Sequence, residues 1–189
     1  MFKKNIEMME NIRIIETDIF TLDCDVIGHQ VNCQGVMGAG LAKEIKIMFP
    51  KVFTEYRKMC SIENKSENLG KCLIVERNNA KTFEPKYIAN IFAQDRYGKD
   101  KCYTSYDSFK KALTDLKIWC KNNIDKDKII IGLPYKIGCG LAGGDWNIVE
   151  PIIENVFGND NKFEIILCKQ IIVNTAKTFE QLKNILSTF

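Results

Sequence analysis

Apolar residues recur along this chain at two spacings, and each spacing predicts a different element. Short apolar runs bounded by polar residues predict buried strands, whereas apolar residues three and four positions apart predict helices with one buried face. The predicted strands cover residues 11–17, 25–32, 72–76, 87–92, 128–133 and 163–168. The predicted helices cover residues 40–49, 52–60, 105–122, 147–157 and 175–189.

The helix over residues 105–122 has the clearest pattern. Ser105 is a good N-cap, and apolar residues from Phe109 to Cys120 recur on one face. Pro50 ends the earlier helix over residues 40–49, because proline cannot continue a helix. Strands that alternate with helices imply an α/β protein with a mixed, largely parallel sheet covered on both faces.

A glycine loop follows the strand over residues 25–32. The strand ends at Asn32, the loop contains Gly35, Gly38 and Gly40, and a helix pattern begins at once. Glycine lets the backbone approach an anion closely, and a helix N-terminus offers free N–H groups at the positive end of its dipole. This order of elements indicates a phosphate-binding loop.

A second glycine loop over residues 138–144 follows the strand over residues 128–133. Two such loops can hold a diphosphate from both sides, so the pair indicates more than either loop alone. The first loop lacks the Gly-Lys-Ser/Thr of a P-loop and the spacing of a dinucleotide fingerprint, which argues against those nucleotide-binding modules.

Length and charge place the chain in a broad class. Its 189 residues suit one domain, and a net charge of +3 is mild. Lysines and arginines form no dense cluster along the sequence, so nothing in it singles out nucleic acid as a partner. No apolar run approaches the roughly 20 residues that span a membrane, and residues 1–11 lack the apolar core of a signal peptide. We expect a cytoplasmic monomer that does not associate with membranes.

Eight cysteines are scattered along the chain without any Cys-x-x-Cys pair, and there is one histidine. This combination does not favour a zinc site. We expect the cysteines to be reduced and mostly buried, and we give none of them a nucleophilic role.

From about Ile12 to Lys169 the sequence resembles the macrodomain family, which binds ADP-ribose in a crevice above the strand ends of a three-layer α/β/α sandwich. Thr17-Asp18-Ile19 resembles the early turn whose Asp binds the adenine amino group. The two glycine loops resemble those around the distal ribose and the diphosphate. The resemblance implies one macrodomain over residues 1–189, with a core over about 12–169 and an added helix over 170–189.

The resemblance also implies which residues contact the ligand, and it implies no metal or other cofactor. The contacts come from the early turn, the two loops and the last strand: Asp18, Ile19, Asn32, Gly35, Met37, Gly38, Ala39, Gly40, Ile137, Gly138, Cys139, Gly140, Leu141, Ala142, Gly143 and Cys168.

Within the family, the chain resembles terminal ADP-ribose protein glycohydrolases and fungal-type ADP-ribose 1″-phosphate phosphatases. His29-x-x-Asn32-Cys33-x-Gly35 is similar to the phosphatase run, and Gly138-Cys139-Gly140-Leu141 before Trp146 is similar to the glycohydrolases. Gln94 and Ala142 stand where the glycohydrolase type has its catalytic Lys and Asp, and an amide cannot form a Schiff base.

The resemblance therefore implies hydrolysis of a bond at the distal ribose, either an ADP-ribosyl ester on a protein or nucleic acid or the 1″-phosphate of ADP-ribose. A non-catalytic ADP-ribose reader is the alternative. Asp145 and His29 are the candidate acid–base residues. Each has a structural alternative: Asp145 as the N-cap of the next helix, and His29 as a core residue. Asp18 has the alternative of a turn cap, and Asn32 that of satisfying loop backbone.

Overall fold

Six strands form one sheet at the centre of the protein, in the order β1-β6-β5-β2-β4-β3. The structure is a computed structural model and describes residues 9–77 and 85–170. All neighbouring strands are parallel except β3, which is antiparallel to β4. The predicted mixed, largely parallel sheet is confirmed. The strands are β1 (Ile12–Glu16), β2 (Val26–Asn32), β3 (Cys72–Glu76), β4 (Tyr87–Gln94), β5 (Ile129–Pro134) and β6 (Phe163–Lys169).

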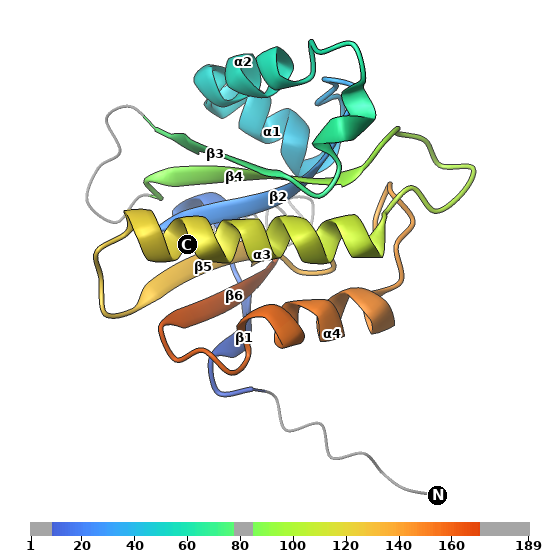
Figure 1. Cartoon of the computed structure of the whole chain (residues 1–189). Helices are drawn as coiled ribbons and strands as arrows, with labels where there is room; N and C mark the ends of the chain where they lie inside the picture. Colours follow the sequence, from blue (N-terminus) through green and yellow to red (C-terminus); the bar gives the residue numbers. More distant parts are fainter. Residues whose placement is uncertain (1–8, 78–84, 171–189) are drawn as a thin grey trace, which may run out of the picture.

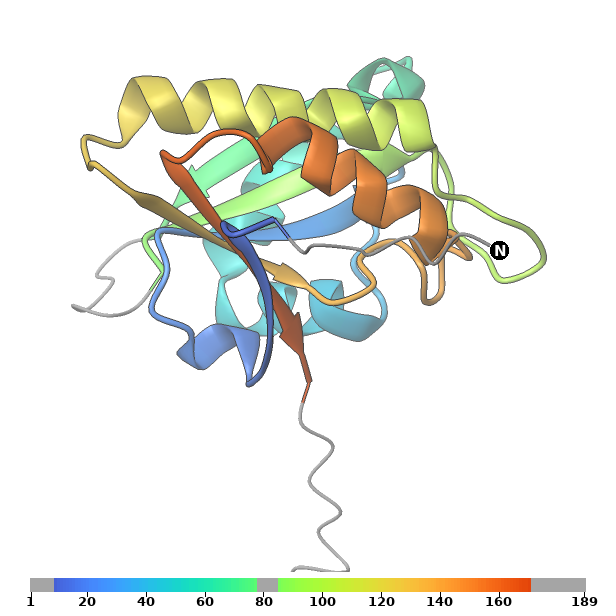
Figure 2. The ribbon, with the colours of Figure 1, turned by 90° about the horizontal axis from the view of Figure 1, so that it is seen from below.

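Helices cover both faces of this sheet and complete the expected three layers (Figure 1). One layer holds α1 (Gly40–Met48) and α2 (Pro50–Met59), and the other holds α3 (Tyr106–Asn123) and α4 (Trp146–Phe157). Figure 2 shows α3 and α4 side by side on their face. The remaining helical segments are the 3-10 turns η1 (Ile19–Thr21) and η2 (Lys65–Asn68).

The predicted elements agree with the structure except near their ends. The strand predicted to stop at residue 92 continues to Gln94, because β2 pairs with β4 as far as Asn32 opposite Gln94. Pro50 ends the region of α1 and also begins α2, as its fixed φ and missing N–H allow. The predicted helix over residues 175–189 lies outside the described residues. No helix in the described ranges is long and apolar enough to cross a membrane.

Strand β2 is buried along its length and separates the two faces of the core. Val26 belongs to the same buried cluster as Phe109 of α3, whereas Ile27 belongs to a cluster with Ile45 of α1 and Val52 of α2. Alternate residues of β2 therefore face opposite helical layers. Its carboxyl end carries Asn32 and the first glycine loop, so the core fixes where that loop starts.

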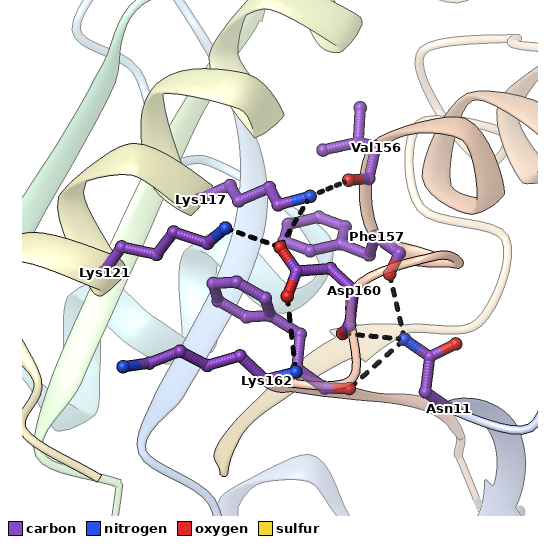
Figure 3. A network of polar contacts seen from close by, with 8 residues as sticks. Asn11, Lys117, Lys121, Val156, Phe157, Asp160 and Lys162 are labelled. Atoms are coloured by element: carbon purple, nitrogen blue, oxygen red, sulfur yellow. Dashed lines mark hydrogen bonds and ion pairs between the residues drawn. The ribbon is translucent and has the colours of Figure 1, made fainter. Parts of the chain in front are cut away.

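A polar network joins the ends of α4, α3 and β6 (Figure 3). The carboxylate of Asp160 accepts hydrogen bonds from Lys121 at 2.6 Å and from the backbone N–H of Lys162 at 3.3 Å, and it forms an ion pair with Lys117 at 3.1 Å. Mainly because of Lys121, the pKa of Asp160 falls to about 2. The ionised carboxylate thus ties the helical layer to the sheet.

The side chain of buried Asn11 anchors the chain just before β1. Its Nδ2 donates to the carbonyl oxygens of Phe157, at 2.9 Å, and Phe163, at 3.2 Å. Buried polar groups need such partners, so Asn11 fixes the approach of the chain to the sheet edge.

Candidate functional site

A cleft of about 710 Å³ opens at the carboxyl ends of β2, β4 and β5. Both glycine loops line it, the first through residues 38–40 and the second through residues 137, 138 and 140–142. Parallel α/β sheets bind ligands outside the carboxyl ends of their strands, where loops and helix starts converge. The two loops predicted from sequence therefore meet at one cavity.

Asn32 shapes the first loop with its side chain. Its Oδ1 accepts from the backbone N–H of Gln34 at 2.9 Å and of Val36 at 3.3 Å, and its Nδ2 donates to the carbonyl of Val36 at 2.6 Å. Gly35 adopts a φ of 76°, which favours glycine. The structure thus gives Asn32 the loop-shaping role that the sequence left as an alternative, although Asn32 also lines the cleft.

Tyr56 of α2 holds Asn32 in place through its hydroxyl group. Its hydroxyl lies 2.8 Å from the Asn32 carbonyl oxygen and 3.0 Å from Asn32 Oδ1, and it donates to them. Burial raises the pKa of Tyr56, so the hydroxyl stays protonated and keeps its donor. Sequence reasoning did not single out Tyr56. The only signal was its place four residues after Val52 on the buried face of α2.

The second loop folds back on itself through Gly138. The carbonyl of Gly138 accepts from Thr104 Oγ1 at 2.7 Å and from the Gly144 N–H at 2.9 Å. A Cβ at Gly138 would lie 2.5 Å from Gln30 Oε1, whereas a Cβ at Gly140 would meet nothing within 4 Å. Gly138 therefore serves the packing of the loop, and Gly140 leaves open space at the cleft.

Two glutamines meet beneath the cleft. Gln30 Nε2 donates to Gln94 Oε1 at 2.8 Å and to Thr104 Oγ1 at 3.0 Å, and Gln94 Nε2 donates to the Arg96 carbonyl at 3.2 Å. Gln30 Oε1 is buried without a hydrogen-bond partner among the described residues. Gln94 lines the cleft, so the position that the resemblance gives to a nucleophile holds an amide with both ends bonded.

His29 is almost fully buried on β2. Its Nε2 lies 2.9 Å from Asn90 Oδ1, and Asn90 Nδ2 donates to the Leu73 carbonyl at 3.1 Å. Since Oδ1 is thus the acceptor, His29 Nε2 carries the proton in this arrangement. Burial lowers the pKa of His29 to about 4, so the ring is neutral at physiological pH. This packing matches the core role that the sequence left open, although His29 also lines the cleft.

Asp145 caps α4. Its Oδ1 accepts from the Asn147 N–H at 2.9 Å and from Asn147 Nδ2 at 3.0 Å, while its own N–H donates to the Tyr106 hydroxyl at 2.9 Å. The side chain is exposed, and Asp145 does not line the cleft. The capping alternative is what the geometry shows.

The residues predicted to contact the ligand do not all line the cleft. The cleft brings together Asn32, Gly38, Ala39, Gly40, Ile137, Gly138, Gly140, Leu141 and Ala142. Its lining does not include Cys139, Gly143, Asp18, Ile19 or Cys168, and Gly35 and Met37 line a neighbouring cavity instead.

Asp18 caps η1, since its Oδ1 accepts from the Phe20 N–H at 3.0 Å. It nevertheless lies near the end of β6, where its charge adds to burial in raising the pKa of Cys168 to about 11. Gln170, just beyond that strand, lines the cleft.

Sequence reasoning missed several lining residues, among them Gln30, Tyr97, Tyr135, Lys136 and Gln170. All except Gln30 lie a few residues past a strand end, which is the signal that could have found them. Lys136 has a φ of 60°, an uncommon conformation for a side-chain-bearing residue. With Lys99 it places two cations at the cleft, where an anionic ligand would be favoured.

Comparison with known proteins agrees with this geometry. The sequence profile of the Macro domain family matches residues 29–153, which include both glycine loops. The chain belongs to the Macro domain family. The expected family and three-layer fold are therefore confirmed for this macrodomain.

Its relatives include enzymes of ADP-ribose chemistry. The macrodomain is 30% identical over 142 residues to an ADP-ribose 1″-phosphate phosphatase of Scheffersomyces stipitis, covering 68% of this chain and 82% of that protein. It is 27% identical over 162 residues to a DNA ADP-ribosyl transferase–DNA ADP-ribosyl glycohydrolase fusion protein of Thermosipho africanus. That match covers 79% of this chain but 40% of the fusion protein.

The macrodomain of Mycobacterium tuberculosis DarG is a similar solved structure. It superposes with a TM-score of 0.68 at 25% identity, covering 84% of this chain and 96% of that one. The fold is therefore shared with a solved macrodomain.

Proposed function

We propose that this macrodomain binds ADP-ribose in the cleft and hydrolyses a bond at the distal ribose. The observation that carries the proposal is the convergence of both glycine loops on one cavity at the carboxyl ends of β2, β4 and β5. Family membership and the phosphatase and glycohydrolase names of its relatives support the same conclusion.

Binding would use backbone groups and fixed cations. Gly38, Gly40 and Gly140 leave room for the backbone to approach a diphosphate, and α1 begins at Gly40 with its N–H groups directed toward the loop. Lys99 and Lys136 add positive charge at the cleft. These features suit an anion with two negative charges better than a neutral ligand.

The bond to be hydrolysed would be an ADP-ribosyl ester on a protein or nucleic acid, or the 1″-phosphate of free ADP-ribose. With an amide at Gln94, a covalent Schiff-base route has no nucleophile there. Catalysis would instead rest on positioning the distal ribose and on backbone N–H groups that stabilise developing negative charge.

For proton transfer we propose Asp145, with His29 as the second candidate. Asp145 follows the second loop directly, and its carboxylate is exposed. His29 lines the cleft, but its low pKa makes the neutral ring an acceptor or donor rather than a general acid near pH 7.

A non-catalytic reader is the second candidate function. It is favoured by Gln94 and Ala142, which line the cleft where the resembled glycohydrolases carry Lys and Asp. A reader would bind ADP-ribose as an enzyme does and would release nothing.

Product release separates the two functions. The protein is incubated with an ADP-ribosylated protein, an ADP-ribosylated oligonucleotide and ADP-ribose 1″-phosphate, and free ADP-ribose and phosphate are measured. Release from at least one substrate, abolished in Gly140→Glu, is expected. Calorimetry with ADP-ribose is run in parallel, with an expected micromolar Kd, or about −8 kcal/mol. Binding without release from any substrate would establish the reader, and no binding at millimolar ADP-ribose would refute both functions.

A further inference from the structure

A second cavity, of about 530 Å³, adjoins the cleft on the first glycine loop. Residues 34–38 line it, and two of them, Val36 and Gly38, also line the cleft. The opposite wall comes from α1, α2 and the segment up to η2. A ligand at the loop end of the cleft would therefore lie next to this second cavity.

Three cations converge on the second cavity from separate elements: Lys46 of α1, Arg57 of α2 and Lys65 of η2. The Lys46 ammonium lies 4.3 Å and the Arg57 guanidinium 5.8 Å from the centre of the Phe53 ring. No Asp or Glu lines the cavity, and within residues 9–77 and 85–170 none of the three cations forms an ion pair.

Like charges gathered without a counter-ion raise the local potential, and a bound anion relieves it. Elsewhere in the described chain, lysines such as Lys121 and Lys126 are paired with carboxylates. The cavity is therefore a concentrated positive site in a protein whose net charge is only +3.

We propose that this cavity binds the phosphate backbone of a single-stranded nucleic acid whose ADP-ribosylated nucleotide occupies the adjoining cleft. The inference rests on the proposed function and selects nucleic acid among its acceptors. A strand carries one charge per nucleotide, so successive phosphates leaving the cleft would meet successive cations. The half-buried Phe53 supplies the aromatic surface that such grooves combine with positive charge.

A protein acceptor fits the cavity less well. Its side chains bring no fixed run of negative charge, whereas every phosphodiester does. Neutral or mixed peptide sequence would leave the three cations unpaired, as they are without a ligand. The structure therefore favours a polyanion with evenly spaced charges.

The test uses one triple variant, the cavity variant, in which Lys46→Gln, Arg57→Gln and Lys65→Gln remove the three cations together. Fluorescence anisotropy measures binding of a labelled oligothymidylate between 50 and 200 mM salt. Each lost phosphate contact lowers the magnitude of the salt slope by about 0.7, so the slope should fall by about 2. At about 0.1 M salt the same contacts correspond to roughly a hundredfold loss of affinity. ADP-ribose affinity, measured by calorimetry, should stay within about threefold.

A control variant carries the same change in net charge at lysines that line neither cavity and lie on α3 or before β5 and β6: Lys110→Gln, Lys128→Gln and Lys162→Gln. It should retain oligonucleotide binding within about threefold, because distant exposed charges are screened at this salt. Equal losses in both variants would show a general charge effect and would overturn the proposal.

Two further outcomes would also overturn it: an unchanged salt slope in the cavity variant, or tighter binding of an acidic peptide than of the oligonucleotide. The oligonucleotide assay needs no turnover. If the wild type hydrolyses no ADP-ribosylated substrate, the proposed function fails while the slope still decides this inference. If the enzyme is active, the cavity variant should lose turnover on ADP-ribosylated oligonucleotide and keep it on ADP-ribosylated protein.

Discussion

The protein should lose stability as pH falls through the range between the two pKa values of His29. In the folded protein burial lowers this pKa to about 4, whereas the unfolded chain has the ordinary value near 6.5. Below pH 6.5 the unfolded state therefore binds a proton that the folded state does not. Unfolding becomes easier down to about pH 4 and does not depend further on this group below that pH.

The size of the effect follows from the two values. A difference of about 2.5 units is worth about 3.4 kcal/mol at the limit, since each unit contributes 1.36 kcal/mol. Relative to pH 7, integration gives a loss of about 2 kcal/mol by pH 5 and about 3 kcal/mol by pH 4. Because the chain has a single histidine, no other imidazole contributes to this range.

Urea denaturation at pH 7, 6, 5 and 4, followed by the fluorescence of Trp119 and Trp146, measures the loss. His29→Gln is the matched variant, since its amide can still donate to Asn90 Oδ1 but does not titrate. The difference between the two stability profiles isolates the histidine from the carboxylates, which titrate in both proteins. Parallel profiles, or an imidazole NMR titration near pH 6.5, would refute the reasoning.

Four other outcomes are expected. Gly140→Glu should abolish ADP-ribose binding in calorimetry with little change in Tm, because a Cβ at residue 140 meets open space at the cleft. Gly138→Ala should lower Tm, because its Cβ would contact Gln30 and its φ is 75°. Equal losses of Tm in the two variants would contradict this assignment. Asp145→Asn should keep the helix cap and reduce turnover more than about tenfold at unchanged affinity, so wild-type turnover would exclude Asp145 as the acid–base group. Tyr56→Phe should destabilise the protein by about 1–2 kcal/mol in urea denaturation, because Asn32 loses a buried donor; an unchanged midpoint would show that water replaces it. Asp160→Asn should cost about 1 kcal/mol at pH 7, since solvent screens the pair, and the difference from wild type should vanish as pH falls from about 4 to 2; a difference that persists at pH 2 would contradict the ionic origin.

Local chemistry explains what could be predicted from the sequence. Ser105 accepts from the Ser108 N–H and caps α3 within one turn, and Pro50 fixes the boundary between α1 and α2. The glycine loops were readable because strand, glycine and helix start follow one another along the chain. Burial of the strands followed from their apolar runs, since a strand covered on both faces needs apolar residues at nearly every position.

Partnerships between distant residues could not be predicted in this way. His29 acquires its low pKa from burial, and its partner Asn90 lies 61 residues away, because β2 pairs directly with β4 although α1, α2 and β3 separate the two strands in the sequence. The residues next to His29 and Asn90 in the sequence do not indicate that these two side chains form a hydrogen bond or that His29 is buried.

The sequence by itself determined the order of elements, the family and the two loops that form the cleft. Only the tertiary structure decided which polar groups face one another. Lys46, Arg57 and Lys65 are dispersed along the sequence and become one positive cavity when α1, α2 and η2 fold against the first loop. Secondary structure depends on neighbours a few residues apart, whereas charge density and pKa depend on distances in space that only chain packing sets.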